Sequence, residues 1–200
     1  MQSFTHLKWN KVGNLNSKSY ICGYCGSSIA SEHGYDAAEV SEAVAYIFIC
    51  HKCTRPTFFQ VREGIQVPGH SFGNEVLDIP DASINLLYSE ARNCTSVNSF
   101  TASIMCCRKL LMHIAVSKGA AAGLSFAKYV DFLSDKGFVP PDGKDWVDHI
   151  RNKGNDANHE IVIMNKNDAE DLITFIEMLL KFIYEFPAKM KQKREEVTPK

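Results

Sequence analysis

The chain has 200 residues, of which 45% are hydrophobic and 22% are charged, and its formal net charge is -1. This composition is typical of a soluble globular protein with one medium domain, or with a small module joined to a domain of about 100–150 residues. The near-neutral charge excludes a general attraction to nucleic acid or to an anionic membrane, so such a partner would have to bind at a local patch.

No segment of the sequence predicts a signal peptide or a membrane span. The first 14 residues lack the apolar core of a signal peptide. The most apolar run, residues 172–186, contains Glu177 and Lys181 and is shorter than the roughly 20 residues that a bilayer span requires. The seven cysteines are an odd number, which argues against a purely disulfide-linked secreted fold. The sequence therefore predicts a cytoplasmic protein without a membrane partner.

Residues 1–63 have the pattern of a zinc ribbon. Two CxxC motifs, Cys22–Cys25 and Cys50–Cys53, flank a stretch that ends in β-branched and aromatic residues, and a second strand-like run follows at 57–62. A CxxC turn places two thiolates on one side of a tight knuckle, and Gly26 provides the permissive backbone that such a knuckle often needs. Two knuckles close a tetrahedral shell of four thiolates, which predicts a structural zinc ion. A loop at 31–39 is expected to absorb the long separation between the motifs.

Other roles for these and the remaining cysteines stay open. A redox function is the main alternative for a CxxC motif, although two paired motifs around strands favour metal. His33 and His51 are spare imidazoles that would serve as ligands only if a cysteine pointed away. The other three cysteines lie in apolar helical surroundings and are expected to pack as small hydrophobes; they are Cys94, Cys106 and Cys107.

After a predicted linker at 64–82, rich in glycine and proline, the hydrophobic period becomes helical. Helices are predicted at 84–93, 99–118, 124–136, 144–152 and 168–186, and Pro187 is expected to end the last one. The predicted fold class is mainly α: a small N-terminal β zinc ribbon, then an antiparallel bundle of about five helices at 83–190. Residues 191–200 are predicted to be a basic tail.

The segment 151–159 gathers a cation, several amides and an imidazole between helical patterns built of core residues. Arg151, Asn152, Asn155 and His159 form a set suited to gripping an anionic or polar partner. The structural alternative is a satisfied polar network that caps two helices around Gly154 and needs no substrate.

The order of several motifs resembles a known family. They are Ile79-Pro80, Leu87-Tyr88-Ser89-Glu90-Ala91, Arg108-Lys109-Leu110-Leu111, Lys118-Gly119, Arg151-x-x-Gly154-Asn155-x-Ala157-x-His159 and Tyr184-x-x-Pro187. Over about residues 76–190 the chain resembles the bacterial and phage "domain of unknown function 4145" family, in which a zinc ribbon is a common N-terminal partner. That family is similar to the HEPN superfamily of helical, often dimeric domains that cleave RNA or bind nucleotides.

The resemblance implies a chemistry for the polar segment. In a metal-independent HEPN-type endoribonuclease, His159 would take the ribose 2′-hydroxyl proton and Arg151 would neutralise the charge that builds on the phosphorane. Asn152 and Asn155 would support them, and Arg108 and Lys109 would contact the nucleic-acid backbone. The separation of Arg151 from His159 is longer than in the superfamily's nuclease motif.

Two kinds of function are therefore expected. The first is a nucleic-acid-associated or protein-binding module of prokaryotic or phage origin with structural zinc, for which the ribbon residues Tyr24, His51, Lys52 and Arg55 form a candidate contact surface. The alternative is the endoribonuclease. By resemblance, the partners are a second copy of the chain, RNA or another nucleic acid, and a protein of a defence or restriction system.

Overall fold

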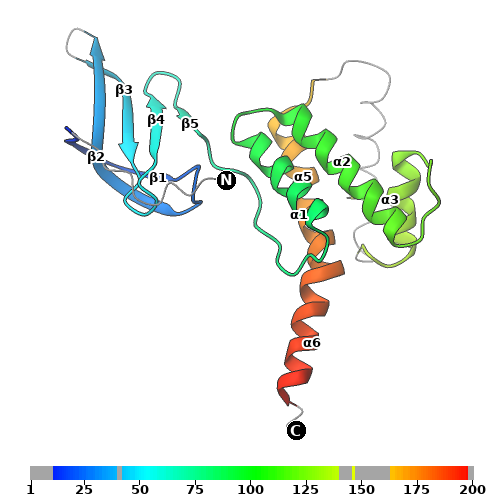
Figure 1. Cartoon of the computed structure of the whole chain (residues 1–200). Coiled ribbons are helices and arrows are strands. Elements are labelled where there is room, and N and C mark those ends of the chain that lie inside the picture. The colour runs from blue at the N-terminus through cyan, green and yellow to red at the C-terminus, as the bar shows by residue number, and fades with distance from the viewer. Residues whose placement is uncertain (1–10, 40–41, 140–145, 147–162, 198–200) are drawn as a thin grey trace. The chain divides into compact units, whose positions relative to one another are not determined.

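The computed structural model describes residues 11–39, 42–139, 146 and 163–197 (Figure 1). The chain divides into two compact units, residues 1–71 (the sheet unit) and residues 72–200 (the helical unit). Of the described residues, 46% are helical and 22% lie in strands. The prediction of a mainly α fold is therefore wrong: the protein is mixed α/β, because the N-terminal part is a full sheet rather than a minimal ribbon.

The sheet unit contains five antiparallel strands, and each strand pairs with the next one along the chain. The strands are β1 (Gly13–Ile21), β2 (Ser28–Glu39), β3 (Glu42–Ile49), β4 (Pro56–Gln60) and β5 (Ile65–Val67). The turns that join β1 to β2 and β3 to β4 each carry one CxxC motif. This simple meander brings the two motifs to the same end of neighbouring strands.

The predicted loop at 31–39 is wrong, because these residues belong to the 12-residue strand β2. Small residues account for the error. A Cβ atom at Gly34 would lie 1.9 Å from the Ile47 carbonyl oxygen of β3, so the two backbones approach too closely for any side chain there. The buried Ser31 hydroxyl donates to the Ile49 carbonyl at 2.8 Å. Residues 31–39 are therefore held in the strand by their neighbours, and they lack the β-branched residues from which strands are predicted.

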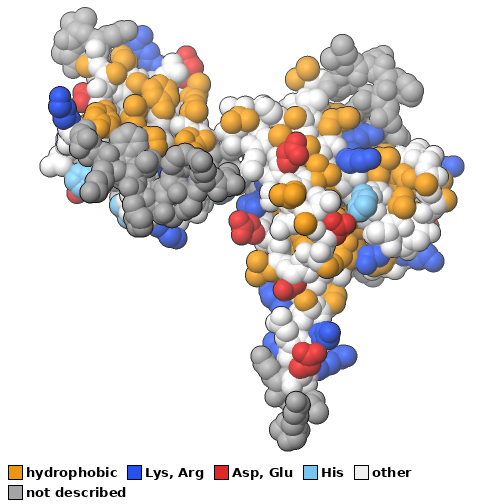
Figure 2. All heavy atoms as spheres, in the orientation of Figure 1, with side chains coloured by type: hydrophobic (Ala, Val, Ile, Leu, Met, Phe, Trp, Pro, Cys, Tyr) orange, Lys and Arg blue, Asp and Glu red, His pale blue; other side chains and the backbone are white. Residues whose placement is uncertain are grey.

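One face of the sheet carries an aromatic core next to the cysteines. The ring of Tyr20 lies 5.0 Å from that of Phe59, and the rings of Phe48 and Phe59 are 5.8 Å apart. The register places four larger side chains in one row across the opposite face: Tyr35, Ile47, Phe58 and Val67. Figure 2 shows hydrophobic side chains gathered over this unit.

The described part of the helical unit contains four helices rather than about five. They are α1 (Ala82–Thr95), α2 (Phe100–Ser117), α3 (Phe126–Asp135) and a continuous run of α5 (Lys166–Leu180), one π-helical turn η2 (Lys181–Glu185) and α6 (Phe186–Val197). Side chains cap the helix starts: Asp81 accepts from the Ser83 N–H, and Asn165 forms a capping box with Asp168. The predicted helix at 144–152 lies outside the described residues, apart from Trp146.

Pro187 does not end the last helix, contrary to the prediction. Proline has no N–H to donate, and its ring would clash with the carbonyl four residues earlier in a regular α-helix. The π turn just before it resolves this conflict, because the Phe186 N–H donates to the Lys181 carbonyl, five residues back. The helix continues to Val197, and Figure 1 shows α6 extending away from α1, α2 and α3. The predicted basic tail is thus helical up to residue 197.

Residues 72–79, within the predicted linker, form a strap along the helices, and β5 occupies 65–67. Val76 is buried in the helical core, and a Cβ atom at Gly73 would lie 2.8 Å from an Ile173 methyl group. The strap makes these hydrogen bonds to helical side chains: Phe72 N to Thr95 Oγ1, Arg92 to Phe72 O and Gly73 O, Tyr88 OH to Asn74 O, Asn74 N and Nδ2 to Glu177, and Leu77 N to Glu185. The strap is therefore an integral part of the helical unit.

Helix α2 lies at the centre of this unit. Among the described helices, it alone has the length and apolar composition of a membrane span. Its buried residues include Ile104, Leu111 and Ile114, which pack in the core with α1, α3 and α5. Its apolar character is accounted for by this central position.

Candidate metal centre

The four cysteines of the two CxxC motifs meet at one point. The sulfur atoms of Cys22, Cys25, Cys50 and Cys53 lie within 4.8 Å of one another. The Cys22–Cys53 and Cys25–Cys50 sulfurs are 3.7 and 3.8 Å apart. A zinc ion bound to four thiolates at about 2.3 Å would space the sulfurs by about 3.8 Å, the edge of the tetrahedron. The four ligand atoms thus already have the spacing of a metal site.

The two knuckles have the same backbone hydrogen bonds. In each, the N–H of the first cysteine donates to the carbonyl five residues later, and the residue after the second cysteine donates back to the first cysteine. The bonds are Cys22 N to Ser27 O (3.0 Å), Gly26 N to Cys22 O (2.8 Å), Cys50 N to Arg55 O (3.0 Å) and Thr54 N to Cys50 O (2.8 Å). The matching bonds make the knuckles equivalent halves of one cluster.

Both knuckles also use a left-handed residue at the same position. Gly26 has φ of 66° and Thr54 has φ of 56°. Glycine adopts this conformation freely, whereas a β-branched residue there is strained. Gly26 therefore provides the permissive backbone that the first knuckle was expected to need. Thr54 adopts the same conformation in the second knuckle with backbone strain.

The surroundings of the sulfurs raise the pKa of two of the thiols and lower the pKa of a third. Burial raises the pKa of Cys22, and it raises the pKa of Cys53 to about 12. Burial also acts on Cys25, but hydrogen bonds from the Ser27 hydroxyl and backbone N–H outweigh it and lower the pKa to about 7. Such donors stabilise a thiolate. A cation bound among the four sulfurs would favour the thiolate form of all of them.

The spare histidines are not part of this cluster. All seven cysteines are free thiols. The metal-type cluster found among the described residues contains only the four cysteines, so neither His33 nor His51, both exposed, belongs to it. The arrangement fits a closed, four-sulfur site of the kind that stabilises a small fold.

The ribbon residues predicted as a contact surface are partly brought together. The Arg55 guanidinium lies 5.1 Å from the centroid of the Tyr24 ring, so side chains of the two knuckles meet in a cation–π contact. His51 and Lys52 are exposed on the same turn as Cys50. This end of the sheet unit therefore presents a cation, an aromatic ring and an imidazole.

The predicted nucleic-acid contacts Arg108 and Lys109 have different environments. Lys109 is exposed on α2. Arg108 is only 6% exposed, and its guanidinium lies 4.4 Å from the centroid of the Phe126 ring. Burial lowers the pKa of Arg108. The predicted catalytic and supporting residues Arg151, Asn152, Asn155 and His159 lie outside the described residues.

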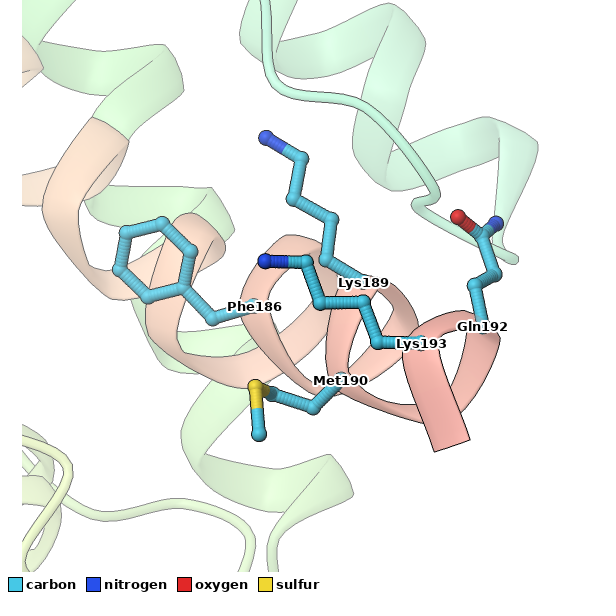
Figure 3. Close-up of a pocket in the computed structure, with 5 residues that line it drawn as sticks. All are labelled: Phe186, Lys189, Met190, Gln192 and Lys193. Atoms are coloured by element: carbon cyan, nitrogen blue, oxygen red, sulfur yellow. The ribbon is translucent and has the colours of Figure 1, made fainter. Parts of the chain in front are cut away.

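A further candidate surface lies on the π turn and α6, where the sequence predicted only the end of a helix and a tail. Phe182, Phe186 and Met190 are 49%, 44% and 54% exposed, and the rings of Phe182 and Phe186 meet edge to face at 5.5 Å. Phe186, Met190, Lys189, Gln192 and Lys193 line one pocket. Figure 3 shows the Lys189 and Lys193 side chains reaching toward the Phe186 side of the helix. We call these six residues the α6 face.

A sheet that gathers four cysteine sulfurs, followed by a separate helical unit, defines a two-unit protein with a candidate metal centre. Residues 89–196 match the family described as "Domain of unknown function (DUF4145)", and the chain belongs to this family. The match covers most of the helical unit and leaves the cysteine cluster outside it. Comparisons with curated proteins and with solved structures gave no match.

Proposed function

We propose that the protein is a nucleic-acid-associated module in which four thiolates bind a structural zinc ion and the α6 face contacts the nucleic acid. The observation that carries the nucleic-acid part is the pairing of exposed aromatic rings with lysines on one helix. Any base can stack on an aromatic ring, and lysines neutralise the phosphates beside it. The proposed ligand is therefore single-stranded nucleic acid, bound with little sequence preference.

The zinc part rests on the spacing of the sulfurs and on the donors around them. Cys22, Cys25, Cys50 and Cys53 would hold the ion, and a closed shell of four protein ligands leaves no position for substrate. The ion would stabilise the sheet unit by cross-linking its two knuckles. It has no part in a reaction.

The charges of the α6 face suit a polyanionic partner. The segment 186–197 contains four basic and two acidic residues. Lys189 pairs with Glu185 and Lys191 lies 3.9 Å from Glu195, whereas no described carboxylate pairs with Lys193. Lys189 and Lys193, four residues apart, project from the same side of the helix. These cations give the local patch that the near-neutral chain requires for binding an anion.

Fluorescence anisotropy with a labelled 16-nucleotide RNA or DNA strand tests this proposal. Removing one base stack is worth about 1–3 kcal/mol, so Phe186→Ala is expected to weaken binding about tenfold or more. Lys193→Gln is expected to weaken binding and to reduce the salt dependence by the contribution of about one phosphate. Leu86→Ala, at an exposed apolar residue of α1, and Lys166→Gln are matched controls that should bind like the wild type. Equal affinities for all four variants would refute the α6 face.

RNA cleavage of the HEPN type is the second candidate, and it rests on the resemblance of the Arg151–His159 segment, which lies within the residues 89–196 that match the family. An RNA panel without divalent metal, with Arg151→Ala and His159→Ala alongside, tests it. Products with 2′,3′-cyclic phosphate ends that both variants fail to form would establish the ribonuclease. Cleavage that survives both changes would exclude these residues as its catalytic pair.

The expected partners are tested separately. Light scattering coupled to size-exclusion chromatography measures whether two copies associate, as the proposed homodimer requires. A protein partner of a defence or restriction system remains a proposal based on resemblance alone.

A further inference from the structure

The last segment of the sheet unit, residues 66–69, lies against the first cysteine knuckle. Strand β5 is at one edge of the sheet and β1 is at the other. The Gln66 side chain of β5 nevertheless donates to the Ile21 carbonyl, at the end of β1, at 2.8 Å. The same amide group donates to the Pro68 carbonyl at 3.1 Å. Gln66 therefore joins the two edges of the sheet beside Cys22, the first residue of the knuckle.

A glycine inside the knuckle allows this segment to touch it. Gly23 lies between the cluster residues Cys22 and Cys25. A Cβ atom at Gly23 would lie 2.4 Å from the carbonyl oxygens of both Pro68 and Gly69. Both oxygens belong to the backbone, which cannot turn aside as a long side chain can. The φ of Gly23 is not positive, so the knuckle itself does not require glycine there. The close approach of the segment 66–69 is what requires it.

We infer that a metal ion bound by the four cysteines latches the segment 66–69 onto the first knuckle. This inference rests on the proposed zinc site. The ion would fix the positions of Cys22 and Cys25, and with them the Ile21 carbonyl and the bare backbone of Gly23. Without the ion, the sulfurs of the two knuckles are no longer cross-linked, and the segment loses the fixed surface on which it rests.

The latch acts on the chain that leads into the helical unit. Residues 70 and 71 separate the segment from the strap at 72–79. While the latch is closed, this chain is held up to Gly69. Once the latch opens, it is held by the pairing of β5 with β4, which ends at Val67. Metal occupancy thereby sets the length of the tether between the cysteine cluster and the unit that carries the α6 face.

Digestion of the full chain with proteinase K, with the cleavage sites mapped by mass spectrometry, tests the latch. A protease cleaves a segment that has left its contacts. Removing zinc by chelation should speed cleavage within 68–71 about fivefold or more, as is usual for coupled sites. Gln66→Ala should speed it about two- to tenfold with zinc present, the effect of one hydrogen bond. Gly23→Ala should make cleavage there fast with or without zinc, because the added methyl group displaces the segment.

Metal affinity gives an independent readout, because the coupling between two binding events is reciprocal. Titration with Co²⁺, followed by its thiolate charge-transfer absorption, measures this affinity. Gln66→Ala should weaken Co²⁺ binding by at most the factor by which it speeds cleavage, about two- to tenfold. The absorption spectrum should not change, because the same four sulfurs remain the ligands.

Two matched controls make the same changes away from the latch. A Cβ atom at Gly13 would lie 3.8 Å from its nearest neighbour, the Gly34 carbonyl oxygen, so Gly13→Ala adds only an ordinary contact. Gln60→Ala removes a glutamine side chain from β4. Both variants should be cleaved within 68–71, and should bind Co²⁺, like the wild type.

Three outcomes would overturn the inference, and they are distinguishable. A wild-type chain that binds Co²⁺ but is cleaved within 68–71 equally fast with and without zinc has a metal site and no latch. Chelation that speeds cleavage within 13–39 as much as within 68–71 would show that the ion holds the whole sheet. A wild-type chain that binds no Co²⁺ would overturn the proposed metal site, and the latch with it.

Discussion

Glu177 fastens the strap to the helical unit, and its replacement by glutamine is expected to destabilise that unit strongly. One carboxylate oxygen accepts the Asn74 N–H at 2.8 Å and the other accepts the Asn74 side-chain amide at 3.0 Å. Lys181 pairs with the same carboxylate, whose side chain is 13% exposed. Glutamine removes the charge, and its amide group would place a donor against one of the Asn74 donors.

The magnitude follows from these contacts. A hydrogen bond to a charged group contributes about 1.5–3 kcal/mol, and the partly exposed pair with Lys181 adds about 0.5 kcal/mol. Because glutamine keeps one acceptor, we expect Glu177→Gln to lower the free energy of unfolding by about 3 kcal/mol. Glu170→Gln is the matched control on the same helix. The Glu170 carboxylate lies 3.6 Å from Lys166, whose side chain is 67% exposed, so its loss should cost about 0.5 kcal/mol or less.

Trp146 provides the assay, because it packs against Phe175 in the helical core, with ring centroids 5.3 Å apart. Replacing Trp9 by phenylalanine leaves Trp146 as the only tryptophan, so its fluorescence during urea unfolding reports on the helical unit. A cost for Glu177→Gln no larger than that for Glu170→Gln would refute the proposed clamp.

The same carboxylate gives the stability of this unit a pH dependence. Burial alone would raise the pKa of Glu177, but hydrogen bonds from Lys181 and Asn74 outweigh it and lower the pKa. A carboxyl group with a depressed folded-state pKa adds stability above its unfolded pKa of about 4.3 and loses it as the pH falls through the folded value. The difference between wild type and Glu177→Gln should therefore shrink below about pH 4.3. A difference that stayed constant down to pH 2 would contradict this linkage.

Three further outcomes are expected. Gly26→Ala should destabilise the sheet unit by about 1–2 kcal/mol, because residue 26 has a left-handed backbone that alanine adopts only with strain. Thr54→Gly should leave the stability of the sheet unit unchanged or raise it. Thermal unfolding of both variants distinguishes these effects. Chelation with EDTA should lower the unfolding temperature of the sheet unit. Metal affinity should fall between pH 8 and pH 6 because protons compete for the sulfurs, and the zinc content after dialysis at each pH measures this fall. Pro187→Ala should stabilise the helical unit by about 1 kcal/mol or more by restoring a backbone donor, as measured by urea unfolding; a loss of stability would show that core packing requires the π turn.

Much of the helical unit could be predicted because its elements are defined by local sequence. Gly119 and Gly137 have positive φ and follow α2 and α3 closely, as the predicted helix ends required. The hydrophobic period of α2 marks the residues that lie at the centre of the core. These signals need no knowledge of the rest of the chain.

The sheet could not be predicted in the same way. In β1 most side chains are exposed, and Tyr20 is its single buried residue. In β2 the backbone of β3 approaches Gly34 so closely that only glycine fits, and glycine does not indicate a strand in the sequence. Strand β2 forms because β3, with its apolar residues, offers an edge to pair with, and β1 in turn pairs with β2. The cysteine cluster was nevertheless predictable, because CxxC spacing places two sulfurs together whatever the length of the intervening strands.

The α6 face shows why a local irregularity can hide a candidate site. A proline predicts the end of a helix, and beyond that end an exposed basic segment predicts only a tail. In this chain the π turn accommodates Pro187. The same turn contains Phe182 and ends just before Phe186, and the two rings are exposed and in contact. Because the helix then continues, Lys189 and Lys193 line the same pocket as the Phe186 ring. The conformation that removes the helix break therefore also builds the surface that we propose binds nucleic acid.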